Sequence, residues 1–180
     1  MTVTDVNVVK STIFERPDDA NKGTLGSLLC VCGSYGMAGA AVMSAKGALR
    51  TGIGLAKCAL PRSIYPIVAQ TILESVYYPL SENADGRISK VNVPFLVSES
   101  CKSSATLVGC GLGVCDDTLK IVFSLIEDST TPLVLDADAL NCVAKQPEIL
   151  LRKKAPIIIT PHPGEMSRPV SYTHLRAHET

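Results

Sequence analysis

The stretch Ser27–Arg50, SLLCVCGSYGMAGAAVMSAKGALR, indicates the fold class of this chain. Its first six residues form a short apolar run between two glycines, which is typical of a buried strand. The glycine-rich segment Gly33–Gly39 predicts a turn, and Ala40–Arg50 predicts a helix. Small side chains recur along that helix at every fourth position, as Ala40, Ser44 and Ala48, so the helix can lie close to a sheet.

The same order of apolar strand, glycine-marked turn and helix recurs along the rest of the chain. Such alternation predicts an α/β fold with a mostly parallel central sheet and helices on both faces. We expect Asp116 or Asp117 to cap one of the helices. The expected strands are 27–32, 55–60, 74–80, 105–108, 133–135 and 157–160, and the expected helices are 40–50, 63–70, 91–100, 116–127 and one starting at 140.

Four strands end in segments that could carry chemistry, at the edge where open α/β sheets bind ligands. The first, Gly33–Ala41, has the spacing G-x-x-G-x-x-G directly before a helix. That spacing matches neither the dinucleotide-binding nor the P-loop fingerprint, so it indicates either a phosphate site or a tight structural turn. The second, Gly109–Gly113, reads GCGLG and either contacts a ligand or lets a helix pack closely.

The third strand exit carries two carboxylates, Asp136 and Asp138, on either side of Ala137. They point the same way if the strand continues, and would then hold Mg²⁺ through waters or orient a ligand hydroxyl. The alternative is that one of them caps the next helix.

The fourth exit is Thr160–Met166, TPHPGEM, which follows the apolar run 156–159. Two prolines fix the backbone on either side of His162, and Gly164 allows a turn that few other residues make. A lone loop histidine is often incidental, but this rigid setting favours a positioned binding group.

Composition excludes several classes of function. Lys and Arg total 17, as do Asp and Glu, and no basic cluster is present, which argues against nucleic acid or a membrane as partner. No apolar run approaches the roughly 18 residues of a membrane span, and the first residues lack a secretion signal. Seven cysteines without a C-x-x-C pair indicate reduced thiols in a cytoplasmic protein, and we expect all seven to fill the core.

Residues 170–180, VSYTHLRAHET, have neither an apolar stripe nor a turn signature. They resemble a translated sequencing adapter, with Pro169 at the junction, although an ordinary polar tail is the alternative. We therefore divide the chain into a lead-in over 1–22, the N-terminal part of one domain over 23–168, and a non-native tail over 169–180.

Four segments together resemble a known family. They are NKGTLGSLLCVCGSYGMAGAAVMSAKGALRTGIGLAKCALP, LVGCGLG, LVLDADALN and IITPHPGEM, and they lie between Asn21 and Arg168. In this order they are similar to the ADP- or ATP-dependent NAD(P)H-hydrate dehydratases, whose fold is ribokinase-like. Two residues depart from the family pattern, since Ala38 and Cys110 stand where proline is common.

The resemblance implies a repair reaction on hydrated NADH or NADPH. The ring hydroxyl is phosphorylated from ADP or ATP with Mg²⁺, and phosphate is then eliminated to restore NAD(P)H. It implies that the full-length parent is a homo-oligomer. The residues implied as contacts to the hydrated dinucleotide are Ala40, Ala41, Gly109, Gly111, Gly113 and His162.

The family's G-[ST]-G-D segment, which supplies the anion hole and the aspartate base, is missing from this sequence. We therefore assign no catalytic residue, and expect a fold that is incomplete at its C-terminus, inactive by itself and prone to aggregate. Two alternatives stay open: a ribokinase-like kinase for a small alcohol, and a non-catalytic nucleotide-binding half-domain.

Overall fold

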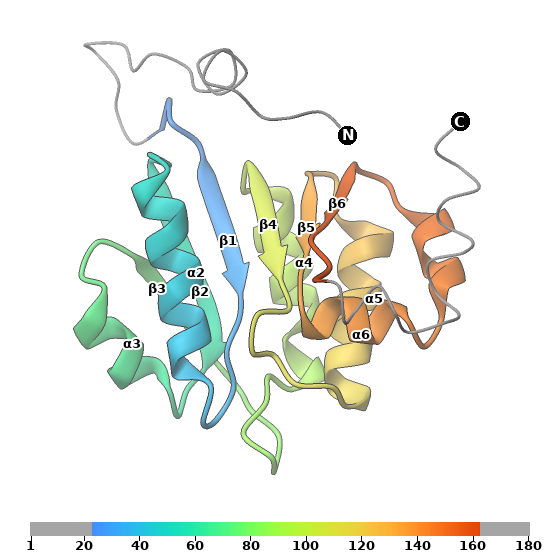
Figure 1. Ribbon diagram of the computed structural model, residues 1–180, viewed down its shortest axis with the longest axis horizontal. Helices are drawn as coiled ribbons and strands as arrows, with labels where there is room; N and C mark the ends of the chain where they lie inside the picture. Colours follow the sequence, from blue (N-terminus) through green and yellow to red (C-terminus); the bar gives the residue numbers. More distant parts are fainter. Residues whose placement is uncertain (1–22, 163–180) are drawn as a thin grey trace.

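A computed structural model describes residues 23–162 of the chain (Figure 1). Six strands, all paired in parallel, form one sheet in the order β3-β2-β1-β4-β5-β6. The predicted α/β class with a parallel sheet is confirmed. The predicted lead-in over 1–22, the non-native tail, and Gly164 in the TPHPGEM segment lie outside the described residues.

Every predicted strand and helix within 23–162 is present, and most of their ends lie within two residues of the predicted ones. The strands are β1 (Ser27–Val31), β2 (Leu55–Pro61), β3 (Val76–Leu80), β4 (Ala105–Val108), β5 (Leu133–Leu135) and β6 (Ile157–Ile159). The α-helices are α2 (Ala38–Arg50), α3 (Tyr65–Thr71), α4 (Val93–Cys101), α5 (Asp116–Asp128) and α6 (Asp138–Val143), and the 3-10 helices are η1 (Lys90–Asn92) and η2 (Pro147–Arg152).

The strand order reverses in the middle of the sheet. The chain runs outward from β1 through β2 to β3, returns to place β4 on the other side of β1, and then runs outward again to β5 and β6. The chain after β1 therefore continues to α2 on one face of the sheet, and the chain after β4 continues to α5 on the other face. In open α/β sheets this switch point, at the carboxyl ends of the strands, is where ligands bind.

Alternating side chains divide the core between the two faces of the sheet. Leu29 and Val31 of β1 point into a large core with α4, α5 and α6, whereas Cys30 and Cys32 point into a smaller core with α2 and α3. Figure 1 shows α2 and α3 on one side of β1–β3, and α4 with α5 on the other side. The prediction of helices on both faces is thereby confirmed.

The buried small residues of α2 lie one position further along the helix than the sequence predicted. Ala41 and Ala45 are buried against the sheet, whereas Ala40, Ser44 and Ala48 are only half-buried beside them. Methyl groups at the buried positions allow the close approach of helix and sheet that the sequence predicted.

The predicted cap of α5 is wrong. Asp116 and Asp117 already lie in the first helical turn, and the N-cap is Cys115, whose backbone N–H donates to Thr118 Oγ1 at 2.9 Å. Asp117 instead accepts a hydrogen bond from Asn83 Nδ2 at 3.0 Å. The side chains of Asp116 and Asp117 still lie where the helix dipole favours negative charge.

The cysteines only partly follow the core-filling prediction. Cys30, Cys32, Cys58 and Cys142 are buried as free thiols. Cys101, the last residue of α4, is exposed, so the prediction is wrong there because the end of this helix faces solvent. None of the helices within residues 23–162 is long and apolar enough to cross a membrane.

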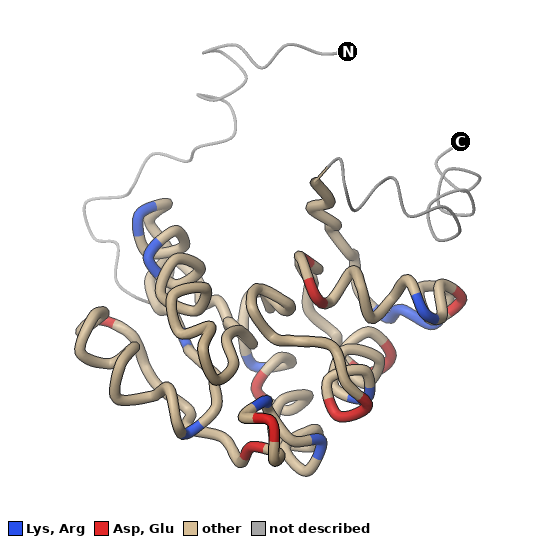
Figure 2. Tube along the Cα trace, turned by 60° about the horizontal axis from the view of Figure 1, so that its bottom comes forward, with Lys and Arg blue, Asp and Glu red and all other residues tan. Residues whose placement is uncertain are grey.

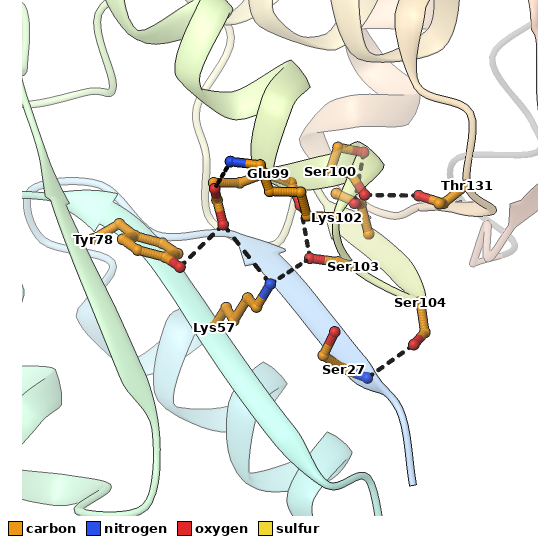
Figure 3. A network of polar contacts seen from close by, with 10 residues as sticks. Ser27, Lys57, Tyr78, Glu99, Ser100, Lys102, Ser103, Ser104 and Thr131 are labelled. Carbon is orange, nitrogen blue, oxygen red and sulfur yellow. Dashed lines mark hydrogen bonds and ion pairs between the residues drawn. The ribbon is translucent and has the colours of Figure 1, made fainter. Parts of the chain in front are cut away.

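A polar network lies on the large-core side of the sheet, where α4 crosses β2 and β3 (Figure 3). The carboxylate of Glu99 accepts hydrogen bonds from Tyr78 Oη at 3.0 Å and from Lys102 Nζ at 2.8 Å, and it lies 3.7 Å from Lys57 Nζ. The side chains of Glu99 and Lys57 are both only 12% exposed. The network therefore balances two charges that have lost most of their water.

Beside this network, a chain of hydroxyl groups connects α4 with β4 and with the loop before β5. Ser100 Oγ lies 2.9 Å from Thr106 Oγ1 and 2.7 Å from Ser129 Oγ, and Thr131 Oγ1 donates to Ser100 O at 2.8 Å. Because these hydroxyls satisfy one another, the large core can include them without leaving a polar atom unpaired.

We predict that Glu99→Gln lowers the free energy of unfolding by about 2 kcal/mol at pH 7, because Lys57 then stays buried without its counter-charge. The hydrogen bond from Lys102, with smaller contributions from Tyr78 and Lys57, holds the pKa of Glu99 below its ordinary value of 4.5 against the effect of burial. A carboxylate whose pKa is lowered by folding stabilises the folded chain at pH values above its ordinary pKa. This stabilisation is lost as the pH falls through the pKa of the folded chain.

Urea unfolding at a series of pH values measures this difference, which we expect to shrink below about pH 4.5. Glu127→Gln is the matched control, because Glu127 pairs with Arg152 at 2.8 Å where both side chains are more exposed. Its effect should stay within about 0.5 kcal/mol. Equal effects of the two substitutions would contradict the prediction.

We expect two neighbouring residues of β6 to respond differently to the same substitution. Ile157 and Ile159 pack against the large core, whereas Ile158 lies on the opposite face and is 58% exposed. We expect Ile158→Lys to reduce light scattering by concentrated protein while changing stability by less than about 0.5 kcal/mol. Ile157→Lys should instead destabilise by about 1 to 2 kcal/mol, because it places a charge against the large core at a half-buried position. An unchanged scattering signal for Ile158→Lys would show that this face does not drive association.

Candidate functional site

Four strand exits converge at the carboxyl edge of the sheet. They are the turn after β1, the glycine turn after β4, the start of α6 after β5, and the segment Thr160–His162 after β6. Figure 2 brings this edge forward and shows acidic and basic residues interspersed around it. The turns 33–37 and 109–115 contain no charged residue, so backbone groups dominate the middle of the edge.

The turns after β1 and β4 are bonded directly to each other. Gly33 N donates to Cys110 O at 2.8 Å, and the buried hydroxyl of Ser34 donates to Gly111 O at 2.8 Å. These bonds satisfy buried polar groups of both turns and fix their relative position. The two glycine-rich segments that the sequence singled out therefore form one structure.

Asp136 joins the turn after β4 to the segment that follows β6. Its Oδ2 accepts a hydrogen bond from Cys110 Sγ at 3.1 Å, and its Oδ1 accepts one from Thr160 Oγ1 at 2.7 Å. Asp138 acts at the other end of the same turn, where its Oδ2 accepts from Gly113 N at 2.8 Å. Asp136 thus holds the start of the glycine turn through the thiol of Cys110, and Asp138 holds its end through the amide of Gly113.

The condition under which Asp136 and Asp138 would point the same way, a strand that continues past them, is not met. The strand β5 ends at Leu135, and Asp138 is the first residue of α6. The N-cap of α6 is Ala137, so neither aspartate caps that helix as the alternative supposed. Ala137 is the only non-glycine residue with a positive φ within 23–162, at 46°, and this backbone reversal separates the two carboxylates.

Close packing explains two of the glycines. A Cβ on Gly109 would overlap Asp136 O and lie 2.7 Å from Ala139 N, and its φ of +124° is unsuited to other residues. A Cβ on Gly111 would lie 2.7 Å from Ala40 Cβ. The close-packing interpretation of the GCGLG turn therefore holds at both positions.

The residues predicted to contact the hydrated dinucleotide differ in how deeply their side chains are buried. Ala40 is half-buried and faces Gly111, whereas the methyl group of Ala41 is buried in the smaller core, which leaves its main chain for any contact with a ligand. His162 is exposed and follows Thr160, which is bonded to Asp136. Gly39 lies inside α2, because this helix begins two residues before the predicted start.

The loop 83–87 also belongs to this edge, although the sequence indicated only a turn there. Tyr35 N donates to Gly86 O at 2.8 Å, and the side chain of Arg87 lies against Gly113 and pairs with Asp85 at 3.1 Å. Sequence spacing gives no sign of these contacts, because Tyr35 and Gly86 are 51 residues apart and Arg87 and Gly113 are 26 residues apart, and no motif links them. An open pocket of about 360 Å³ beside the loop is lined by Tyr35, Ser63, Glu82, Asn83, Ala84, Asp85 and Gly86.

The described residues do not form a metal site of their own. The oxygens of Asp136 accept from Cys110 and Thr160, and those of Asp138 accept from Gly113 and from Asn141 Nδ2 at 3.2 Å. No group of three or more His, Cys, Asp and Glu side chains within 23–162 is arranged to hold a metal ion. The prediction that Asp136 and Asp138 hold Mg²⁺ through waters or orient a ligand hydroxyl stays a prediction.

We predict that Gly109→Ala destabilises the chain by about 3 kcal/mol, because the added methyl group clashes with main-chain atoms and the backbone conformation is strained. Gly47→Ala is the control, since it lies within α2 with open space at its Cβ position. The control should stabilise by about 0.5 to 1 kcal/mol through helix propensity. Thermal unfolding of both variants measures the contrast, and a stable Gly109→Ala variant would contradict the packing argument.

Comparison with known proteins identifies relatives of this architecture. The family model described as NAD(P)H-hydrate dehydratase matches residues 28–175. The bifunctional NAD(P)H-hydrate repair enzyme Nnr of Thermofilum pendens is 37% identical over 153 residues, which are 85% of this chain and 29% of the relative. The ADP-dependent (S)-NAD(P)H-hydrate dehydratase of Neisseria meningitidis is 31% identical over 156 residues, which are 85% of this chain and 48% of the relative.

Solved structures share the fold. The ADP/ATP-dependent NAD(P)H-hydrate dehydratase of Bacillus subtilis, co-crystallised with ATP/Mg²⁺, is 27% identical with a TM-score of 0.69, over 95% of this chain and 58% of that one. A ribokinase-like superfamily protein of Enterococcus faecalis, 19% identical with a TM-score of 0.72 over 87% of this chain and 52% of that one, shows the ribokinase-like fold alone. The chain spans less than half of these two curated relatives and little more than half of the solved structures. The fold, the convergent strand exits and the match over most of its length show that the chain belongs to the NAD(P)H-hydrate dehydratase family.

Proposed function

We propose that this chain forms the substrate-binding part of a nucleotide-dependent NAD(P)H-hydrate dehydratase. The reaction restores NADH or NADPH from its hydrated form by phosphorylating the ring hydroxyl and eliminating phosphate. The observation that carries the proposal is the convergence of the two bonded glycine turns with the exit of β6 at one edge of the sheet. The family match favours this reaction over a small-alcohol kinase.

The hydrated dinucleotide lies over the junction of the two turns in this proposal. Ala40, at the start of α2, and the main chain of Gly109–Gly113 form its floor, and His162 reaches it from the exit of β6. Small side chains and close backbone leave room for a flat ring, and the helix N-terminus favours the negative charge of the diphosphate. Holding the substrate in one orientation is the contribution that these residues make to phosphoryl transfer.

The phosphoryl donor in this proposal is ADP or ATP, in keeping with the names of the Neisseria and Bacillus relatives. Asp136 and Asp138 stabilise the glycine turn rather than carry the chemistry, since their carboxylates already accept hydrogen bonds from it. Their role is to keep the amides and carbonyls of that turn in place when the substrate binds.

We predict that His162→Ala weakens binding of hydrated NADH by about three- to tenfold, which is the loss of one polar contact. Equilibrium dialysis with the 180-residue chain measures the change. His174→Ala is the control, because His174 lies in the tail that the sequence indicates to be non-native, and it should leave binding unchanged. Equal weakening by both substitutions, or no binding of hydrated NADH to the unmodified chain, would count against the proposal.

A further inference from the structure

Four of the seven cysteines gather around the smaller core, on one side of the sheet. Cys30 of β1 lies directly opposite Cys58 of β2, and Cys32, after β1, lies beside Cys110 in the turn after β4. The first two are buried in the middle of the sheet, at 2% and 1% exposure. The second two lie at its carboxyl edge, where the strands diverge.

The backbone holds Cys32 and Cys110 side by side. Val31 pairs with Val108 in the parallel ladder, Gly109 N donates to Val31 O at 3.2 Å, and Gly33 N donates to Cys110 O at 2.8 Å. Continuing this register places Cys32 opposite Gly109, one residue from Cys110. With neighbouring strands about 4.8 Å apart, such a one-residue offset stays within the separation of Cα atoms that a disulfide bridges. The two thiols lie close enough that each shifts the pKa of the other.

We propose that Cys32 and Cys110 form a peroxide-sensitive thiol pair that closes to a disulfide at the strand exits. Cys110 is the sulfur that peroxide reaches, because it is partly exposed at the edge of the sheet, whereas Cys32 is 1% exposed behind it. Cys32 is the resolving thiol. This inference does not depend on the proposed function, since it concerns the chemistry of the two thiols.

The chemistry balances with hydrogen peroxide as the oxidant. The Cys110 sulfur attacks one peroxide oxygen, the O–O bond breaks, and water leaves, which gives a sulfenic acid. The Cys32 sulfur then attacks the Cys110 sulfur, the S–O bond breaks, and a second water carries away the oxygen with the thiol proton. Two thiols have then lost two electrons, and one peroxide molecule has become two waters.

The surroundings of the pair favour this order of events. The hydrogen bond from Cys32 lowers the pKa of Cys110, although burial and the carboxylate of Asp136 oppose the effect. The same contact, together with burial, raises the pKa of Cys32. A partly exposed sulfur with a lowered pKa reacts first, and a neighbouring thiol resolves the product.

Cys115 resembles Cys110 in partial exposure and in a pKa that is lowered, against the effect of burial, by hydrogen bonds from Thr118, so its oxidation is followed alongside that of the pair. The remaining cysteines differ from Cys110 in access or in pKa. Burial raises the pKa of Cys142 to about 11 and raises that of Cys30 far above its ordinary value. Cys101 is exposed at the end of α4, where its Sγ donates to Asp128 O at 3.7 Å, and the strand β4 separates it from the glycine turn. Cys101 is therefore the internal control for simple surface oxidation.

The test treats the folded 180-residue chain with hydrogen peroxide, removes the oxidant, and alkylates the thiols in denaturant before peptide mass spectrometry. We expect a linked pair of peptides that contain Cys32 and Cys110, with loss of alkylation at both and recovery after dithiothreitol. Cys30, Cys58 and Cys142 should remain alkylated. Oxidation of chain that is unfolded beforehand should give at least about tenfold less of this link, because the proximity is lost.

Two variants sharpen the result. Cys110→Ser should leave Cys32 alkylated after peroxide treatment, whereas Cys101→Ser should form the link as the unmodified chain does. Oxidation confined to Cys101, or a Cys110 oxidised beyond sulfenic acid beside an alkylated Cys32, would overturn the proposal. The comparison of folded with unfolded chain uses no variant, so the proposal stays testable if Cys110→Ser fails to fold.

Discussion

The candidate site depends on the close approach of the main chains that leave β1, β4 and β5. At Gly109 the carbonyl of Asp136 occupies the space that a side chain would need, and at Gly111 the methyl group of Ala40 does so. Because these positions carry no Cβ, the turn after β4 can accept hydrogen bonds from Gly33 and Ser34 across the switch point. The convergence of the strand exits follows from that contact.

Polar contacts hold this arrangement at both ends of the parallel sheet. At the carboxyl edge, Asp136 and Asp138 fix the two ends of one glycine turn through Cys110 and Gly113. Where α4 crosses β2 and β3, Glu99 balances the buried cation of Lys57. The glycine turns have few side chains to pack, so their position depends on hydrogen bonds, whereas the strands between them depend on apolar packing.

The departures from expectation have a common physical cause. Asp117, Asp136 and Asp138 were each interpreted from their neighbours in sequence, as a helix cap or as ligands on one strand face. In the folded chain each of them accepts a hydrogen bond from a residue 25 or more positions away, namely Asn83, Cys110 and Gly113. A carboxylate at a strand exit binds whichever donor the tertiary structure brings to it, and residue spacing does not encode that donor.

The sequence by itself determined the α/β class, the order of strands and helices along the chain, the four strand exits at the candidate site, and the family. It could do so because apolar runs, glycine turns and helical periodicity are local consequences of burial and backbone geometry. Only the tertiary structure decided that β4 lies beside β1, that Ala40 rather than Ala41 faces the glycine turn, and that Cys32 meets Cys110. These facts depend on the lateral order of strands and on the rotation of α2, which are set when the two faces of the sheet are packed together.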